Sequence, residues 1–312
     1  MSADSRRLRL PGPATLLPDI WPLARTGHRL LQGAARREAV VDNHRMVWLE
    51  RGRPSSHRPT VLLIHGFAAM KENWASWLPL LPRDWHLLAL DLPGFGESDY
   101  RLGAHYTYEA QAARLAHWLQ SRGLDNVHLV GSSMGGAIAT VLASVAGPNV
   151  RSLTLLNSAG FPSSPGQELR PSDFGRERTT LIPENLQGIY TMFNSVGTGK
   201  PTLAGVLMTG LLGPDLLKRT GQHKHIFNDM LADPWAPLRH LQDGERPLLV
   251  QWGDRDVVTP TACVDWFRQH TPSAQITVFR RVGHLPMMET PLHSAQVLTD
   301  FVRHLPAAGQ RG

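Results

Sequence analysis

Short and almost entirely apolar runs recur along the chain, and the intervals between them are long enough for a helix. Such runs are typical of strands that are buried on both faces of a sheet. The pattern predicts strands at 60–65, 86–92, 126–131, 151–156, 247–253 and 275–282. Upstream of these, apolar residues flank Asp42-Asn43, a dipeptide that favours tight turns, and this predicts a short hairpin.

Helical patterns separate the predicted strands. They cover residues 71–81, 108–122, 134–146, 261–270 and 291–305. Regular alternation of strand and helix predicts an α/β fold, in which helices cover both faces of a mostly parallel sheet.

One long segment, 161–243, interrupts this alternation. It has no buried-strand pattern, but it contains helix-like pieces around 182–193, 202–212 and 224–231. An insertion of this length is too long for a loop. We therefore expect a helical cap subdomain over one edge of the sheet, inserted into a core formed by 37–160 and 244–312.

Composition narrows the class of protein. The chain has 312 residues, of which 42% are hydrophobic, so a wholly disordered chain is excluded. No apolar run approaches the ~20 residues of a membrane-spanning helix. Cys263 is the only cysteine, which excludes an internal disulfide and fits a reducing compartment. We expect a cytoplasmic protein, with peripheral attachment to the inner membrane left open.

The net charge of +6 does not predict a nucleic-acid partner. Most of the arginines are scattered singly or in pairs, which is typical of a solvated surface rather than of a continuous basic patch. The N-terminal segment 1–36 lies outside the strand–helix alternation. Its pattern predicts a basic amphipathic helix from Ile20 to about Arg36. That helix either docks on its own domain or rests on an anionic membrane surface.

The clearest chemical motif follows the predicted strand 126–131. Gly131-Ser132-Ser133-Met134-Gly135 has the G-x-S-x-G pattern of a nucleophile elbow and stands between a strand and a helix, as that motif requires. A side chain at either flanking glycine would collide with neighbouring backbone. Ser133 is the predicted nucleophile, placed where the helix dipole favours negative charge. The adjacent Ser132 is the alternative.

Two later strands also end in reactive side chains. Asp254 and Asp256 follow the strand 247–253, and His284 follows the strand 275–282. A serine hydroxyl needs a base within hydrogen-bond reach, and the base needs an acceptor that fixes its tautomer. His284 is the predicted base, and either carboxylate could orient it. The order Ser, Asp, His is the one expected for strand ends of such a sheet.

An oxyanion hole is predicted beside the nucleophile. His65-Gly66-Phe67 follows the first buried strand, and the backbone N–H groups of Phe67 and Met134 could receive the oxyanion of a tetrahedral intermediate. Such a donor contributes a factor of about 10²–10³ to the rate. His65 is interpreted as support for this turn.

Two further groups have structural interpretations. The segment 91–98 is interpreted as a structural turn. His223 and His225 are interpreted as a solvated face of the cap rather than as metal ligands, because no cysteine or carboxylate cluster accompanies them.

Together these motifs resemble the α/β-hydrolase superfamily, and the resemblance extends from about residue 40 to 305. Within it, the chain resembles bacterial lipases and monoacylglycerol or phospholipid hydrolases that carry a helical cap. The resemblance implies that Asp256, three residues beyond Gly253, is the acid, with Ser133 as nucleophile and His284 as base. Neither the motifs nor the resemblance implies a cofactor or a metal.

The predicted function is a serine carboxylic-ester hydrolase acting on a small acyl ester or lipid. Apolar residues of the cap and after the base suit an acyl chain, and the candidates for substrate contact are Phe193, Leu207, Leu211 and Met287. An alternative is that these side chains only pack the cap onto the core.

Two other functions stay open on the same fold. One is carbon–carbon bond hydrolysis, although that family usually has Trp after the base where Leu285 stands here. The other is ligand binding without catalysis, which an intact Ser133, Asp256 and His284 disfavours. Dehalogenases and epoxide hydrolases of this fold need a carboxylate nucleophile, and Ser133 excludes them.

Overall fold

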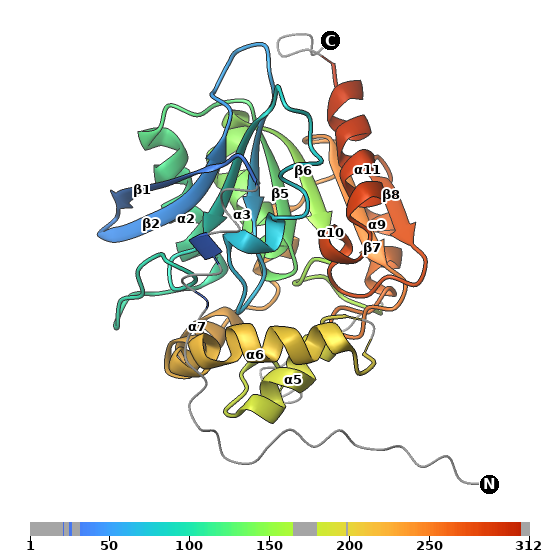
Figure 1. The fold of residues 1–312 in the computed structure, drawn as a ribbon. Coiled ribbons are helices and arrows are strands. Elements are labelled where there is room, and N and C mark those ends of the chain that lie inside the picture. The colour runs from blue at the N-terminus through green and yellow to red at the C-terminus, as the bar shows by residue number, and fades with distance from the viewer. Residues whose placement is uncertain (1–20, 22–24, 27–31, 165–179, 198, 307–312) are drawn as a thin grey trace, which may run out of the picture.

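An eight-stranded sheet forms the centre of the molecule (Figure 1). The computed structural model describes residues 21, 25–26, 32–164, 180–197 and 199–306. The strand order is β1-β2-β4-β3-β5-β6-β7-β8; β2 pairs antiparallel with both β1 and β4, and all other neighbours are parallel. The mostly parallel sheet is therefore confirmed. The strands are β1 Ala35–Val41, β2 His44–Arg51, β3 Thr60–Ile64, β4 His86–Asp91, β5 Val127–Ser132, β6 Val150–Leu156, β7 Leu248–Gly253 and β8 Gln275–Phe279.

The predicted hairpin is confirmed as β1 and β2. Asp42 and Asn43 join them with φ values of 47° and 61°, the left-handed backbone that a two-residue hairpin turn requires. The predicted helix to Arg36 is wrong at its end, because Ala35 and Arg36 belong to β1 and pair with β2. Most of that predicted helix lies outside the described residues.

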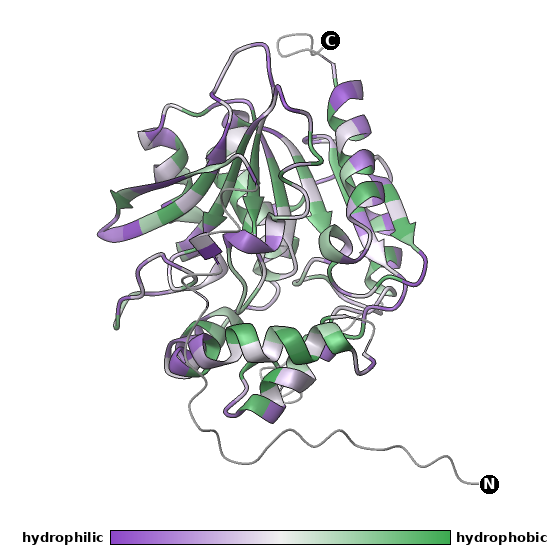
Figure 2. Ribbon diagram, viewed as in Figure 1, coloured by the Kyte–Doolittle hydropathy of each residue, from purple (hydrophilic) through white to green (hydrophobic). Residues whose placement is uncertain are grey.

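The buried strands are covered on both faces. In β3, Leu62 and Ile64 pack into one hydrophobic cluster, whereas Val61 and Leu63 pack into a second cluster on the opposite face. Successive side chains of a strand point to opposite faces, so a strand buried on both faces must be apolar throughout. Figure 2 shows the central strands as largely hydrophobic.

Helices supply the two covering layers. The first layer contains α2 Tyr108–Ser121, α3 Met134–Ala146 and α9 Cys263–His270, whose apolar side chains join the first cluster. The second contains the 3-10 helix η1 Lys71–Trp74 and the helices α10 Pro286–Glu289 and α11 Pro291–His304. A second 3-10 helix, η2 Gly147–Asn149, follows α3. Four of the five predicted core helices agree with α2, α3, α9 and α11 to within two residues.

The predicted helix 71–81 is wrong beyond its first turn. Only η1 is helical there, and turns follow it. Pro79 and Pro82 cannot donate a backbone hydrogen bond and disfavour helix in the residues before them. Trp74 and Trp77 are fully buried against the sheet, so this irregular segment covers the core without a regular helix.

Between β6 and β7, the described residues include four helices with defined bounds at both ends. They are α5 Leu186–Ser195, α6 Leu203–Lys218, α7 Thr220–Leu231 and α8 Ala236–His240. In Figure 1, α5, α6 and α7 lie together beyond one end of the sheet. Ile226 of α7 reaches the turn after β4, where a Cβ added to Gly94 would lie 2.5 Å from its Cδ1. This layer therefore rests on the turns that follow the parallel strands. No helix in the described ranges is both long and apolar enough to cross a bilayer.

Candidate active site

Ser133 occupies a strained turn between β5 and α3. Its backbone has φ 54° and ψ −123°, a conformation that residues other than glycine rarely adopt. A Cβ at Gly131 would lie 2.2 Å from the carbonyl oxygen of Gly135, and one at Gly135 would lie 2.3 Å from that of Ile64. The two glycines thus allow β3, β5 and α3 to approach closely. Such strain is typical of a functional position.

The structure separates the two adjacent serines. Ser132 is the last residue of β5 and is fully buried, and its hydroxyl has no hydrogen-bond partner among the described residues. Ser133 stands at the amino end of α3 and is partly exposed. Its backbone N–H donates to the carbonyl of Leu156 at the end of β6, over 2.9 Å. The geometry therefore favours Ser133 as the accessible hydroxyl.

Asp256 and His284 lie in direct contact. The distance between Asp256 Oδ2 and His284 Nδ1 is 2.7 Å. Oδ2 also accepts a hydrogen bond from the Thr259 hydroxyl, and Oδ1 accepts from the backbone N–H groups of Val258 and Thr259, all within 3.0 Å. By contrast, Asp254 Oδ1 accepts from the backbone N–H of Arg281 over 2.6 Å. Of the two candidate carboxylates, the structure brings Asp256 to the histidine.

Asn157 holds the same carboxylate and was not predicted. Its side-chain amide donates to Asp256 Oδ2 over 2.5 Å, and its own Oδ1 accepts from the backbone N–H of Gly253 over 3.3 Å. Asn157 follows β6 directly and has φ 44°. A polar residue immediately after the predicted strand 151–156 was the available signal, since strand ends carry the other candidate groups. Thr259 offered no comparable signal.

Close packing of turns brings the strand ends together. A Cβ at Gly253 would lie 2.1 Å from the carbonyl oxygen of Gly283, so the turns that carry Asp256 and His284 are in contact. The backbone N–H of Ala159, two residues beyond Asn157, donates to the Ser133 carbonyl over 3.1 Å. Contacts thus connect the elbow to the Asp–His pair through the end of β6.

One contact of the predicted triad is not formed. Among the hydrogen bonds of the described residues, none joins the Ser133 hydroxyl to the His284 ring. In enzymes without substrate, catalytic hydrogen bonds are often long and tighten when the substrate binds.

Opposing influences act on the pKa of Asp256. Burial raises it, whereas the adjacent His284 and the hydrogen bonds from His284, Thr259 and Asn157 lower it, and the net shift is downward. The carboxylate therefore stays ionised at neutral pH and can hold the imidazole by Nδ1. The other ring nitrogen, Nε2, is the one that Asp256 does not bind.

The two predicted oxyanion donors are available. Neither the Phe67 nor the Met134 backbone N–H donates to another described residue. Gly66 lies over the nucleophile, since a Cβ there would lie 3.2 Å from Ser133 Cβ. The His65 side chain donates to the Gly66 carbonyl over 2.7 Å and accepts from the Leu92 N–H over 3.0 Å, which agrees with its predicted supporting role.

Aromatic side chains of α7 cover the Phe67 ring. Phe227 packs edge-to-face on it at 5.2 Å, and His223 lies 5.6 Å away while stacking on Phe95. The prediction of a solvated His223 is wrong: the side chain is buried, and burial lowers its pKa to about 3. The sequence could not show which face of α7 meets the core. Among the described residues, no group of ligating side chains is arranged to hold a metal.

The four predicted substrate contacts occupy different surroundings. Met287 is fully buried in the second core cluster with Trp74 and Trp77, and the Leu207 side chain is 64% exposed, so neither placement supports a pocket-lining role. Phe193 and Leu211 pack, partly buried, on a third cluster that includes Met70 of the turn after β3. These two remain the candidates for substrate contact.

Comparisons with known proteins identify the family of this chain. A family model described as the alpha/beta hydrolase fold matches residues 59–187. Lipase 1 of Psychrobacter immobilis is 32% identical over 252 residues, which are 80% of this chain and 78% of that lipase. This chain belongs to the α/β-hydrolase family.

Two further proteins are similar to this α/β hydrolase, one by sequence and one by solved structure. The human monoacylglycerol lipase ABHD6 is 25% identical over 84% of this chain and 80% of its own length. Among solved structures, a membrane phospholipase A described as a bacterial virulence factor is 32% identical, with a TM-score of 0.80 over 91% of this chain and 90% of that one. The fold and the recognition of the superfamily from sequence are therefore confirmed.

Proposed function

We propose that this α/β hydrolase is a serine carboxylic-ester hydrolase that works through an acyl-enzyme on Ser133. The observation that carries the proposal is the buried Asp256–His284 pair, held 2.7 Å apart at the sheet edge where the strained turn presents Ser133. Because a hydroxyl is a weak nucleophile at neutral pH, it needs such a paired base.

The reaction proceeds in two halves. In the first, Ser133 Oγ attacks the ester carbonyl, His284 Nε2 takes the hydroxyl proton, and the N–H groups of Phe67 and Met134 stabilise the oxyanion. The proton then passes to the leaving alcohol as the carbon–oxygen bond breaks. In the second half, water attacks the acyl-enzyme by the same route and releases the carboxylic acid. Asp256 stays ionised throughout and stabilises the imidazolium.

Lipids are the proposed substrate class. Named relatives include lipases, monoacylglycerol lipases and a phospholipase A. The helix α6 also supports an apolar substrate, because it has no charged residue before Asp215 and its Met208 and Leu211 pack, partly buried, on the third cluster. Figure 2 shows this helix as largely apolar.

An ester series tests the substrate class. We expect kcat/KM for p-nitrophenyl esters to rise at least about tenfold from butyrate to octanoate, because each buried methylene contributes about 0.8 kcal/mol. Leu211→Ala should flatten this rise, since Leu211 faces the cap interior. Leu207→Ala is the matched control on the exposed side of α6, and its slope should equal that of the wild type. Failure to turn over any p-nitrophenyl or glycerol ester would reject the proposed function.

Within the N-terminal segment 1–36, we propose membrane contact only for residues 1–20. Trp21 is 8% exposed and packs in the third cluster, and Arg25 pairs with Glu97 over 3.4 Å, so these two face the protein. The contact is therefore proposed for the arginines within residues 1–20, which are Arg6, Arg7 and Arg9, against an anionic surface.

Deleting residues 1–20 keeps the docked Trp21 and Arg25 and removes those arginines. We expect weaker co-sedimentation with vesicles that contain anionic lipid, and little binding of either form to neutral vesicles. Equal binding of both forms to the anionic vesicles would reject membrane contact through this segment.

A further inference from the structure

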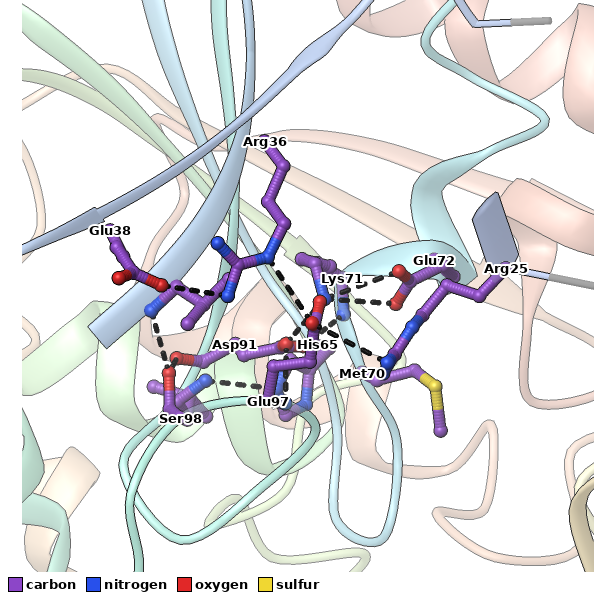
Figure 3. Close-up of polar contacts among 12 residues, drawn as sticks. Arg25, Arg36, Glu38, His65, Met70, Lys71, Glu72, Asp91, Glu97 and Ser98 are labelled. Atoms are coloured by element: carbon purple, nitrogen blue, oxygen red, sulfur yellow. Dashed lines mark hydrogen bonds and ion pairs between the residues drawn. The ribbon is translucent and has the colours of Figure 1, made fainter. Parts of the chain in front are cut away.

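A fully buried lysine ends the turn that carries the predicted oxyanion donor. We define the oxyanion turn as residues 65–70, between β3 and η1. The Lys71 side chain is completely buried, and its Nζ lies 2.6 Å from Asp91 Oδ2, 2.7 Å from Glu97 Oε2 and 3.2 Å from Glu72 Oε1 (Figure 3). Buried lysines are rare and need compensating partners. The proposed chemistry does not use this one.

The Asp91 carboxylate binds Lys71 through both its main chain and its side chain. Oδ1 accepts from the Lys71 backbone N–H over 2.7 Å, and Oδ2 accepts from Nζ. Oδ2 also accepts from the backbone N–H of Glu97 over 2.8 Å. A Cβ at Gly96 would lie 2.2 Å from Asp91 Cγ, so the following turn closes tightly around the carboxylate. Lys71 is therefore fixed to the end of β4 at two points.

The other end of the oxyanion turn is fixed to the same place. His65 accepts the backbone N–H of Leu92, the residue after Asp91. Between these two anchors, Ala68 has φ 52°, which costs free energy for a residue with a Cβ. Such a turn keeps its shape only where its surroundings impose it. The strand order β4-β3-β5 places these anchors, the turn and the Ser133 elbow side by side.

Charge around Lys71 is balanced, so the ion pair persists. Burial lowers the pKa of Lys71, but Asp91, Glu72 and Glu97 raise it, and the net shift is upward. Glu97 also pairs with Arg36 over 3.2 Å and with Arg25 over 3.4 Å. Lys71 thus remains protonated in a cluster of alternating charges.

We propose that the Lys71–Asp91 pair is a positioning device that sets the direction of the Phe67 N–H towards the oxyanion. This inference rests on the proposed function, because it assigns the pair a role in that reaction. Lys71 acts through the turn and does not touch the substrate. The pair therefore affects the tetrahedral state, in which the oxyanion forms, far more than it affects substrate binding.

The double variant Lys71→Met/Asp91→Asn tests the role without leaving either of these two charges buried and unpaired. We expect kcat for a p-nitrophenyl ester to fall about 10- to 100-fold, less than for a donor deleted outright, with KM changed by less than about twofold. Affinity for an alkyl boronic acid, which forms a tetrahedral adduct on a serine, should fall by a similar factor. Fluorophosphonate labelling of Ser133 should slow in parallel.

Glu50→Gln is the matched control. Glu50 accepts a hydrogen bond from buried His86 over 3.0 Å, at the opposite end of β4 from Asp91. The substitution therefore removes a comparable side-chain contact far from the oxyanion turn. Its kcat and boronic acid affinity should stay within about twofold of wild type. If the double variant fails to fold, Lys71→Arg is the second variant to measure. It keeps the positive charge but is larger than the fully buried lysine that it replaces, and its kcat should also fall.

Two results would overturn the positioning role. The first is a wild-type kcat in the folded double variant or in folded Lys71→Arg. The second is an unchanged boronic acid affinity in either of these variants. A wild-type protein that labels at Ser133 but hydrolyses no ester contradicts the proposed function instead. In that case, the labelling rates of the variants still decide the positioning role.

Discussion

Ser133→Ala is expected to abolish ester turnover, with a fall in kcat of about 10⁶-fold. The methyl group of the alanine cannot attack the ester to form the acyl-enzyme. A water molecule near His284 is a poor replacement for the serine hydroxyl as nucleophile. Steady-state hydrolysis of a p-nitrophenyl ester measures the loss. Thermal unfolding should change little, because the Ser133 hydroxyl makes no hydrogen bond among the described residues.

Ser132→Ala is the matched control for this result. Its hydroxyl is buried at the end of β5 without a hydrogen-bond partner, so an alanine fits the same space. Activity should remain within about threefold of wild type, in line with a substitution that leaves packing intact. Comparable losses in both variants, or substantial turnover by Ser133→Ala, would reject Ser133 as the nucleophile.

Asp256→Asn has the second largest expected effect, a fall in kcat of about 10⁴-fold with the fold retained. An amide at this position cannot stabilise the imidazolium and favours the wrong tautomer of His284. The carboxylate accepts five hydrogen bonds, one from His284 and four from Asn157, Val258 and Thr259. The amide nitrogen of an asparagine would face some of these donors. The measurement is kcat as a function of pH, compared with the wild type.

Asp254→Asn separates the two carboxylates. Asp254 accepts the backbone N–H of Arg281 through Oδ1, and an asparagine can keep that bond through its own carbonyl oxygen. A change of no more than about threefold in kcat is expected. The assignment of the acid fails if Asp254→Asn is the more damaging of the two substitutions.

Sequence patterns predicted the parts of the fold that repeat a simple physical rule. The strands 60–65 and 151–156 were visible because burial on both faces requires continuous apolar residues. The elbow was visible because Gly131 and Gly135 have no room for a side chain, as the 2.2 Å and 2.3 Å approaches show. Local rules of this kind leave a direct trace in sequence.

Features that depend on tertiary contacts were not predictable in the same way. Lys71 was expected in a helix and does begin η1, but nothing in the sequence showed that it would be buried beside Asp91, 20 positions along the chain. His223 was assigned to a solvated face, although it packs on Phe95. Asn157 holds Asp256 across 99 positions. In each case the decisive partner is distant in sequence, and no periodicity reports it.

Peptide mass spectrometry of the fluorophosphonate-labelled protein tests the central claim most directly. The full-length protein is labelled, digested and sequenced, with His284→Ala labelled in parallel. The account predicts one adduct, on Ser133, and labelling slower by several orders of magnitude when the imidazole is removed. An adduct on another residue, or equally fast labelling without His284, would contradict a serine activated by this Asp–His pair.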